Sequence, residues 1–470
     1  MAANGMKQSD GFPHATSANL DIVIVSLTSV FFFFCFDHVL SIFQIGASLG
    51  GLATALALKR LPSPHAHNIT LLERNPASLL HNQGAGIVAG GDTLAFFQRY
   101  DKCKRDLAAS SIRRQYFNEN GEIIHKEDMR QNMTSWDLAY YVLRANVDGV
   151  KSRYCQVPEN DESRSKVTHL HGHTVTRLEE KGGKVVVEYK THEGTNGELE
   201  ADLLIGADGP SSTIRSLLTP DVQRTYAGYV ALRGTVRENE VTPETREAFS
   251  ERFSFFHAKG LQILAYLIPG ENGTLEPGKR LINFVYYTNV PSPSLVDPSP
   301  GFRELMTDVD GQYHRITMPP GKTDPQAWEK QRKIARERLP PQFAEIVCST
   351  QKPFIQAVTD VLSPTNEFLN GRVILIGDAL AGFRPHTVAS TSQACFDAMI
   401  LADMIDGKVS RKEWKTQTLG YARTIQKRGV DMGERSQHQD LPLEEHIQDR
   451  NLASRPREKE VWPDWAICEV

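Results

Sequence analysis

A glycine-rich turn between an apolar segment and a helical one constrains the fold of this chain more than any other feature. Residues 46–51 read Gly-Ala-Ser-Leu-Gly-Gly, and residues 52–61, rich in alanine and leucine, are expected to form a helix. The apolar run at residues 69–72 predicts a strand and ends at Glu73. A strand, a tight turn, a helix and a second strand make a βαβ unit, so the sequence predicts an α/β fold.

Such a turn lets the backbone approach a pyrophosphate, which the N-terminus of the following helix attracts. Gly46 and Gly51 occupy the first and last glycine positions of the dinucleotide-binding pattern, and Ser48 replaces the usual second glycine. An acidic residue at the end of the second strand suits the hydroxyls of an adenosine ribose, which makes Glu73 and its neighbour Arg74 candidate ligands. A glycine turn with another role and an ordinary surface glutamate are the alternatives.

Two aspartates follow other predicted strands. The Ala-Asp-Gly-Pro-Ser-Ser segment at residues 207–212 contains Asp208, and one of its serines could cap the next helix. The apolar strand at residues 373–376 runs into Gly377 and Asp378, at the strand end where ligands collect in open α/β sheets. The Asp378 carboxylate could therefore accept hydrogen bonds from the hydroxyls of a cofactor. For residues 207–212, a plain capped turn is the alternative interpretation.

The remaining pattern alternates strands and helices. Asn120-Gly121 favours a tight hairpin turn within residues 114–127. Strand signals dominate between residues 226 and 287, which favours an inserted sheet over further βαβ units. Further strands are expected at residues 185–189, 199–205, 229–236, 262–267 and 281–287, and helices at 328–338, 391–405 and 414–436.

The three motifs, in this order and at these separations, resemble those of the group A FAD-dependent aromatic monooxygenases, the para-hydroxybenzoate hydroxylase-like family. The resemblance covers about residues 45–436 and is greatest to the dihydroxypyridine hydroxylase and salicylate hydroxylase-like members. The residues that carry it are 46–52, 228–234, 314–321, 377–379 and 384–387. The resemblance implies an α/β fold in which a Rossmann-like FAD-binding domain carries an inserted, mainly antiparallel β-sheet substrate domain and a C-terminal helical segment.

The domain boundaries that we expect follow from this architecture. They are a disordered tail at 1–19, the first part of the FAD-binding domain at 20–220 with a β-hairpin excursion near 112–127, the substrate-binding domain at 221–355, the second part of the FAD-binding domain at 356–405, and a C-terminal helix and tail at 406–470.

The same resemblance implies how FAD would be held. Glu73 would bind the ribose, Arg144 the phosphates and Asp378 the ribityl chain. Asp208 would brace the segment around the cofactor, and Pro385 would lie beside the isoalloxazine ring.

Two positions depart from the pattern of the family. The helix that follows residues 387–391 would direct its positive end at the flavin, but it begins with Ala389-Ser390 where a glycine is usual. Leu232 stands where an aromatic residue is expected before Arg233. The first departure bears on the flavin geometry, and the second bears on the identity of the substrate.

A reaction follows from the resemblance. NADH or NADPH would reduce FAD, dioxygen would form a flavin hydroperoxide, and an electrophilic oxygen would pass to a small electron-rich aromatic or heteroaromatic ring. The protein must exclude water, because water wastes the peroxide. His386, Tyr229 or His257 could assist deprotonation of a ring hydroxyl, and each can also be interpreted as a structural residue. The choice between NADH and NADPH stays open.

Two other functions stay open as well. The fold also supports a flavin epoxidase or a Baeyer–Villiger-type tailoring enzyme of secondary metabolism, which product analysis would separate from a hydroxylase. An inactive FAD-binding relative is the third possibility, and a purified protein without colour would favour it.

Charge and cysteine content bound the partners. A net charge of −4 favours neither nucleic acid nor an anionic membrane as a partner. The six cysteines, without a Cys-x-x-Cys pair or zinc-like spacing, predict reduced thiols in a cytoplasmic protein and no metal site. These cysteines are Cys35, Cys103, Cys155, Cys348, Cys395 and Cys468. The expected partners are the aromatic substrate, dioxygen and NAD(P)H, and a homodimer stays open.

One apolar segment, residues 20–45, does not fit the pattern. Residues 20–25 resemble the first strand, yet the glycine turn begins at Gly46; removing residues 26–45 joins Val25 to Gly46 in a continuous strand and turn. We therefore interpret residues 26–45 as a translated intron. The rival interpretation is a membrane-associated segment. Residues 20–36 are at the lower limit of length for a span, and a longer span would include Asp37. In that case residues 40–45 could serve as the substitute strand.

Overall fold

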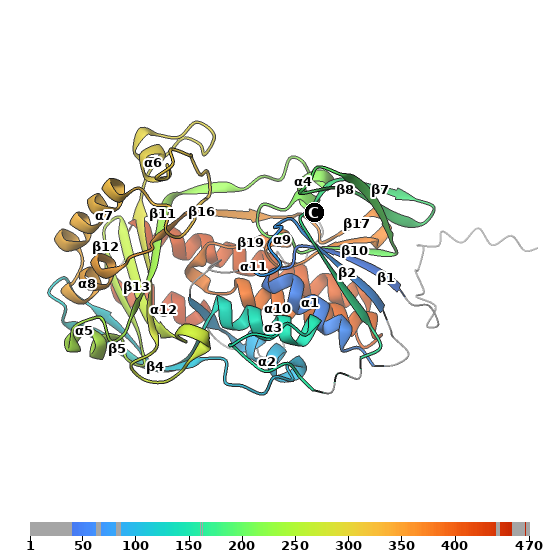
Figure 1. Cartoon of the computed structure of the whole chain (residues 1–470). Helices are drawn as coiled ribbons and strands as arrows, with labels where there is room; N and C mark the ends of the chain where they lie inside the picture. Colours follow the sequence, from blue (N-terminus) through green and yellow to red (C-terminus); the bar gives the residue numbers. More distant parts are fainter. Residues whose placement is uncertain are drawn as a thin grey trace, which may run out of the picture. The chain divides into compact units, whose positions relative to one another are not determined.

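Three β-sheets organise the part of the chain that the structure describes (Figure 1). The structure is a computed structural model, and it describes residues 40–62, 67–80, 86–159, 161, 163–438, 442–453 and 466. The expected tail at residues 1–19 lies outside this range.

The first sheet has six strands and holds the glycine turn. Its order is β17-β18-β10-β1-β2-β6, and every pairing is parallel except that of β17 with β18. The strands are β1 Leu40–Ile45, β2 His67–Glu73, β6 Lys166–His171, β10 Leu203–Gly206, β17 Glu367–Phe368 and β18 Val373–Leu375. Strands β10 and β18 are buried along their whole length, as expected for parallel strands covered on both faces.

Helices cover one face of this sheet and a small antiparallel sheet covers the other (Figure 1). The helices are α1 Leu49–Lys59, α3 Trp136–Asp148 and α10 Ser390–Ile405, and α1 contacts both of the others. The small sheet comprises β7 His173–Lys181, β8 Lys184–Thr191 and β9 Asn196–Ala201. The two layers leave the carboxyl ends of the parallel strands as the open edge, where Ile45 is in register with both Leu72 and Gly206.

The largest sheet is the expected inserted one. Its order is β15-β16-β11-β14-β13-β12-β4-β5-β3, with β19 (Ala381–Gly382) paired to β16. The strands are β3 Gly86–Ala89, β4 Ala109–Phe117, β5 Ile123–Ser135, β11 Thr225–Arg237, β12 Arg252–Ala258, β13 Leu261–Ile268, β14 Leu281–Asn289, β15 Thr317–Met318 and β16 Phe354–Leu362. The predicted hairpin therefore joins this sheet, because β4 pairs with β12.

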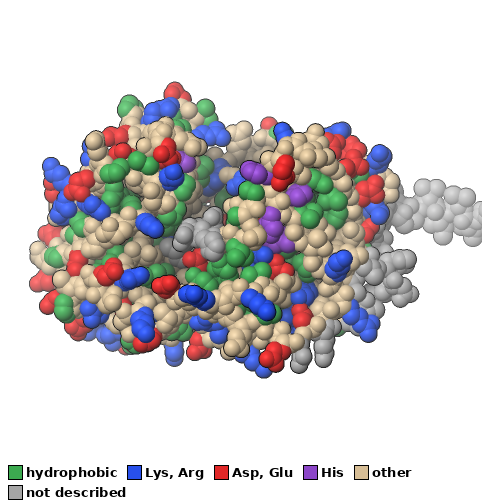
Figure 2. Space-filling view, viewed as in Figure 1, with side chains coloured by type: hydrophobic (Ala, Val, Ile, Leu, Met, Phe, Trp, Pro, Cys, Tyr) green, Lys and Arg blue, Asp and Glu red, His purple; other side chains and the backbone are tan. Residues whose placement is uncertain are grey.

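Helices also cover the large sheet. One face packs against helices α5 (Pro243–Phe249), α7 (Pro325–Arg338) and α8 (Pro341–Ser349) in a single apolar core. Strands β13 and β14 contact α11 (Arg411–His438), and the core on that face includes Ile447 of α12 (Leu443–Ala453). Acidic and basic side chains alternate over the face drawn in Figure 2, without an extended region of one sign.

One predicted strand was wrong. Residues 199–205 form two strands, β9 and β10, that belong to different sheets. The break lies at Asp202, whose N–H donates to Ser41 O and whose carboxylate accepts from Ser41 N at 2.8 Å. This pairing directs the chain out of the small sheet and into the parallel sheet beside β1. Strand β12 was also absent from the sequence-based prediction.

The strand before the glycine turn is Leu40–Ile45, the substitute noted above. Residues 20–25 lie outside the described range, as does most of residues 26–45, so the intron interpretation stays a prediction. Strand β1 contains Gln44, which is fully buried; its Nε2 donates to Gly46 O at 3.3 Å, and its Oε1 has no hydrogen-bond partner. No helix among the described residues is long and apolar enough to cross a membrane.

We expect the protein that lacks residues 26–45 to be more stable than the full-length chain. The deletion joins Val25 to Gly46, so that residues 20–25 take the positions of residues 40–45. Ile24 then stands in the place of Gln44. Removing a buried, unsatisfied amide oxygen should stabilise the fold by roughly 1–3 kcal/mol, measured by thermal denaturation. The single substitution Gln44→Leu in the full-length chain is the matched control and should give part of the gain. A shortened protein that unfolds at a lower temperature would make residues 40–45 the native strand.

Candidate functional site

The glycine turn is pressed against the end of the neighbouring strand β10. Gly46 has φ of +95°, and a Cβ at this position would lie 2.5 Å from Ala207 O. A Cβ on Gly51 would lie 2.0 Å from Gly46 O, so the first turn of α1 also closes on the backbone before it. Ser48 begins α1 without a side-chain cap. The turn therefore requires glycine at both positions and presents the uncapped start of a helix at the open edge of the sheet.

Glu73 supports this turn from the next strand. Its carboxylate accepts from Ala47 N at 3.0 Å and from Asn75 N at 2.9 Å, and the residue is 9% exposed. Arg74, the next residue, is exposed. The structure thus places Glu73 beside the turn, while its contact with a ribose stays a prediction.

Arg144, the predicted ligand of the FAD phosphates, is held by other groups of the protein. It is buried on α3, where it forms an ion pair with Asp148 at 2.9 Å and donates to Ser78 O at 2.9 Å and to Tyr140 Oη. Protein groups therefore engage its guanidinium, which holds the chain after β2 against α3. A contact of Arg144 with FAD phosphates stays a prediction.

Asp208 lies between the end of β10 and the short helix α4 (Thr213–Leu218), whose N-cap is Ser212. Its carboxylate accepts from Ser212 Oγ at 2.6 Å and from Thr213 N at 2.7 Å, while Ser212 Oγ accepts from Arg215 N. Asp208 thus fixes the start of α4, and its bracing of the segment around the cofactor stays a prediction.

Asp378 differs from Glu73 and Asp208 because one of its oxygens is unsatisfied. It lies in the single turn α9 (Gly377–Leu380) after β18, and its Oδ1 is buried without a hydrogen-bond partner. Burial raises the pKa of this carboxyl to about 6, although the charge of Arg224 opposes the shift. Gly377 N donates to Asp397 at 2.8 Å, which fixes the turn. A buried carboxylate oxygen at the edge of a sheet, short of a donor, fits the hydroxyl of a bound molecule.

The segment before α10 links the open edge to the large sheet. It contains the 3-10 turn η3 (Pro385–Thr387), then Val388 in the left-handed region with φ of +52°, and then the start of α10 without a side-chain cap. Arg384 anchors the segment, because its guanidinium forms ion pairs with Asp360 at 2.6 Å and with Glu434.

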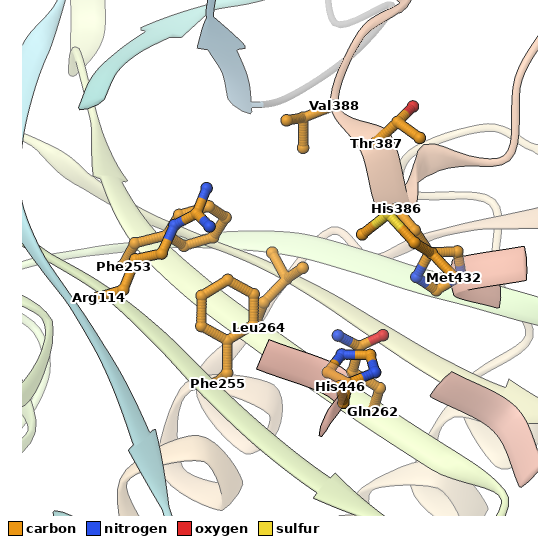
Figure 3. A pocket seen from close by; sticks show the side chains of 10 residues that line it. All are labelled: Arg114, Phe253, Phe255, Gln262, Leu264, His386, Thr387, Val388, Met432 and His446. Atoms are coloured by element: carbon orange, nitrogen blue, oxygen red, sulfur yellow. The ribbon is translucent and has the colours of Figure 1, made fainter. Parts of the chain in front are cut away.

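A pocket lies between this segment and the large sheet (Figure 3). Half of its lining residues are apolar, and the other half are two histidines, an amide, a hydroxyl and one arginine. The residues are Arg114, Phe253, Phe255, Gln262, Leu264, His386, Thr387, Val388, Met432 and His446. The lining of the pocket therefore comes from strands β4, β12 and β13, from η3 and Val388, and from helices α11 and α12.

His386 lines the pocket, and Tyr229 supports it from behind. The Oη of Tyr229 lies 2.9 Å from His386 Nε2, and Tyr229 is 1% exposed. Burial, aided by the charges of His446 and Arg384, lowers the pKa of His386 to about 3. The imidazole is therefore neutral at ordinary pH. Burial also raises the pKa of Tyr229.

His257, the third predicted catalytic residue, is not part of this lining. Its Nε2 lies 3.4 Å from Gln262 Nε2, and its ring packs against the ring of His446 with centroids 4.6 Å apart. It therefore contacts two residues of the lining, Gln262 and His446. The sequence-based prediction did not include Gln262 and His446.

The charged residue of the pocket, Arg114, was also not predicted. It is 3% exposed, donates from Nε to Gln131 Oε1 at 2.6 Å, and lies over the ring of Phe253 at 5.5 Å. Arg113 precedes it on β4 but points to the opposite face, where it pairs with Asp128 at 2.8 Å. The two arginines are neighbours in sequence, and only the orientation of β4 in the sheet decides which of them lines the pocket.

Leu232 does not bear on the substrate in the expected way. It is fully buried in the core between the large sheet and helices α7 and α8. Tyr229 and Ala231 belong to the core on the other face, which includes the aromatic residues of the pocket. Because successive residues of a strand alternate between faces, Leu232 packs away from the pocket.

Comparison with known proteins agrees with this geometry. The sequence model of a family described as FAD binding domain-like matches residues 226–360. The 2,6-dihydroxypyridine 3-monooxygenase of Paenarthrobacter nicotinovorans is 27% identical over 399 residues, which are 84% of this chain and 91% of that protein. The FAD-dependent urate hydroxylase of Klebsiella oxytoca is 24% identical over 370 residues, 77% of this chain and 80% of that protein.

A solved structure shows the same fold. That of 2,6-dihydroxypyridine-3-hydroxylase from Arthrobacter nicotinovorans has a TM-score of 0.72 and 24% identity, and the match covers 86% of this chain and 95% of that one. The chain is a homologue of the FAD-dependent aromatic monooxygenases. The predicted resemblance, the fold class and FAD as the cofactor are thereby confirmed.

The residues of this FAD-dependent monooxygenase fit the cofactor at three places. The turn that begins at Gly46 presents an uncapped helix start suited to the pyrophosphate. The buried Oδ1 of Asp378 lacks a donor that a ribityl hydroxyl would supply. The start of α10, without a capping side chain, suits the negative charge that a reduced flavin carries.

The pKa of Asp378 leads to a prediction about the FAD-free protein. Between the usual carboxyl pKa and about 6, the folded state binds a proton that the unfolded state has released. Its stability therefore falls as the pH rises through this range. Asp378→Asn removes this cost, so the variant should be more stable than wild type at pH 7–8 by about 1–3 kcal/mol. The difference should vanish below about pH 4, measured by denaturation across the pH range.

The control for this prediction is Asp221→Asn, which changes an exposed carboxylate. It should leave the stability unchanged at every pH. FAD should bind the Asp378→Asn variant more weakly than wild type. A variant that is less stable than wild type at pH 8 would contradict the assignment of an unsatisfied carboxylate.

Two glycines of α11 give a matched pair of substitutions. A Cβ on Gly433 would lie 2.5 Å from Tyr229 Oη, whereas the nearest atom to a Cβ on Gly429 is Arg384 O at 3.5 Å. Alanine normally stabilises a helix relative to glycine by about 1 kcal/mol. We expect Gly429→Ala to be neutral or stabilising. Gly433→Ala should destabilise by about 1–3 kcal/mol, because it forces α11 from the Tyr229–His386 pair. Equal effects in thermal denaturation would contradict the close packing.

Proposed function

We propose that this chain hydroxylates a small, electron-rich aromatic or heteroaromatic ring with FAD, NADH or NADPH, and dioxygen. The observation that carries the proposal is the shared segment at residues 384–388. Its Pro385 and the start of α10 belong to the expected flavin site, while its His386, Thr387 and Val388 line the pocket. A ring in the pocket would therefore lie next to the flavin.

FAD, when bound, would carry electrons from NAD(P)H to dioxygen and would supply the electrophilic oxygen. The residues that would hold it are those of the glycine turn, with Glu73, Asp208 and Asp378. The chain's own contribution at the pocket is the exclusion of water. Phenylalanine, leucine, valine and methionine make up half of the lining residues, and this apolar surface suits a reactive site that must stay dry.

His386 orients the ring rather than holding its proton. With a pKa of about 3, its imidazole is a weak base. If Tyr229 donates to Nε2, the proton of the neutral ring lies on Nδ1, which can then donate to an oxygen of the substrate. We assign Tyr229 as the positioning residue of His386. His257 acts, in this proposal, only through its contacts with Gln262 and His446.

Arg114 favours an anionic substrate. It gives the lining a permanent positive charge. His386, by contrast, is neutral at ordinary pH. A deprotonated hydroxyl on an aromatic ring makes the ring more nucleophilic, which is what an electrophilic oxygen requires. For the same reason we propose hydroxylation in preference to epoxidation or Baeyer–Villiger oxidation, whose alkene and ketone substrates are neutral.

The test is turnover with a panel of hydroxypyridines and hydroxybenzoates. The FAD-loaded protein is supplied with NADH or NADPH in air, and we expect substrate-dependent oxidation of the nicotinamide and a product heavier by one oxygen atom. Nicotinamide oxidation that yields only hydrogen peroxide with every ring, together with no hydroxylated product, would refute the proposal.

Two neighbouring arginines test the role of the pocket charge. Arg114→Gln should raise the KM for an anionic ring by about 10–100-fold, because a charge-assisted hydrogen bond is worth roughly 1.5–3 kcal/mol. Arg113→Gln, on the opposite face of the same strand, should leave KM within about twofold. Thermal denaturation checks that both variants are folded. Equal KM values for Arg114→Gln and wild type would contradict the role of Arg114.

A further inference from the structure

Two cysteines from different connections meet beside helix α3. Cys103 lies after α2 (Gly91–Tyr100), and Cys155 lies after α3. The Sγ of Cys103 is 3.9 Å from Val142 O, and the Sγ of Cys155 is 3.6 Å from Tyr141 O, so the two sulfurs contact successive carbonyls of one helix. Both sulfurs therefore lie against the same stretch of α3, near enough for each thiol to affect the pKa of the other.

Asn146 holds the connection of Cys103 on α3. Its Nδ2 donates to Cys103 Sγ at 3.2 Å and to Asp101 Oδ1 at 2.7 Å, and its Oδ1 accepts from Lys102 N at 2.9 Å. Arg105, on the same connection, donates to Gly273 O at 2.6 Å. The position of Cys103 is therefore fixed by several bonds rather than by the thiol contact alone.

The two thiols are not equivalent. The neighbouring Cys103 lowers the pKa of Cys155, and Arg105 and Ser152 act in the same direction. The neighbouring Cys155, with burial, raises the pKa of Cys103. The thiolate is the reactive form of cysteine, so Cys155 is the nucleophile of the pair and Cys103 is its neutral partner.

We propose that Cys103 and Cys155 are a redox-active pair that hydrogen peroxide converts to a disulfide. Both residues are partly exposed, as this reaction needs, whereas Cys395 is buried. No assigned role of the flavin site uses either cysteine. The pair is therefore a modification site separate from the hydroxylation chemistry.

The reaction balances in two steps. The Cys155 thiolate attacks one oxygen of hydrogen peroxide, the O–O bond breaks, and the leaving hydroxide takes a proton to become water, which gives a sulfenic acid. The Cys103 sulfur then attacks the Cys155 sulfur, the S–O bond breaks, and a second water leaves with the Cys103 proton. Two thiols are oxidised by two electrons, and one peroxide is reduced to two waters.

The oxidant has a source in the enzyme itself. A flavin monooxygenase releases hydrogen peroxide whenever oxygen is not transferred to the substrate, and this source rests on the proposed function. The reaction with added peroxide does not depend on it. The disulfide would join the connections after α2 and after α3, and so restrict the segment that Arg105 binds to Gly273.

The test uses the full chain with Cys35 and Cys468 replaced by serine, because both lie outside the described residues. The protein is treated with added hydrogen peroxide in the absence of NAD(P)H, alkylated, digested without reductant and mapped by mass spectrometry. We expect a linked peptide that contains Cys103 and Cys155, the loss of two thiols per chain, and a midpoint of thermal unfolding raised by a few degrees.

Single variants separate the roles of the two sulfurs. Cys103→Ser should stop the reaction at a sulfenic acid on Cys155, which dimedone traps. Cys155→Ser should slow thiol loss at least about tenfold. Cys348→Ser is the matched control, because Cys348 is also partly exposed but lies outside the pair, and it should still form the linked peptide. Peroxide that leaves Cys103 and Cys155 separately alkylable, or links either one to another cysteine, would overturn the inference, whatever the hydroxylase activity.

Discussion

The site depends on the close approach of the Gly46 turn to the end of strand β10. A Cβ on Gly46 would lie only 2.5 Å from Ala207 O, and no rotamer relieves a clash of Cβ with backbone. This contact places the start of α1 level with the ends of β2, β10 and β18. Because parallel strands end at the same edge, Glu73 and Asp208 lie beside this turn, and Asp378 lies at the same edge after β18, on the far side of β10.

The three carboxylates at this edge have different electrostatic situations. Glu73 accepts from backbone N–H groups of the turn, and Asp208 accepts from the start of α4. Burial raises the pKa of both Asp208 and Asp378, but of the three only Asp378 keeps a buried oxygen without a donor. Glu73 and Asp208 therefore have protein hydrogen-bond donors even without FAD. Asp378 lowers the stability of the FAD-free protein, and a hydroxyl group of bound FAD would remove this destabilisation. Cofactor binding is thereby coupled to stability.

The second half of the site is built by one segment, residues 384–388. Arg384 ties it to β16 through Asp360 and to α11 through Glu434, and His386 ties it to β11 through Tyr229. Gly433 lets α11 approach this pair closely. The pocket and the expected flavin position are thus linked through a segment that several ion pairs and hydrogen bonds fix, rather than through a free loop.

The sequence predicted those parts of the fold that local patterns specify. The βαβ unit, the hairpin at Asn120-Gly121 and the strand before Asp378 follow from residue spacing, and the structure contains all three. The break at Asp202 was missed because it depends on pairing with Ser41, which is distant in sequence. The contrast between Arg113 and Arg114, and the meeting of Cys103 with Cys155, depend in the same way on register and packing that one sequence does not encode locally.

The measurement that tests the account most directly is the absorbance spectrum of the purified protein. The account predicts the two visible bands of an oxidised flavin, with FAD released on denaturation at about one molecule per chain. A well-folded protein that stays colourless, and gains no flavin bands when FAD is added, would contradict it, because the turn at Gly46 and the carboxylate of Asp378 would then have no cofactor to bind.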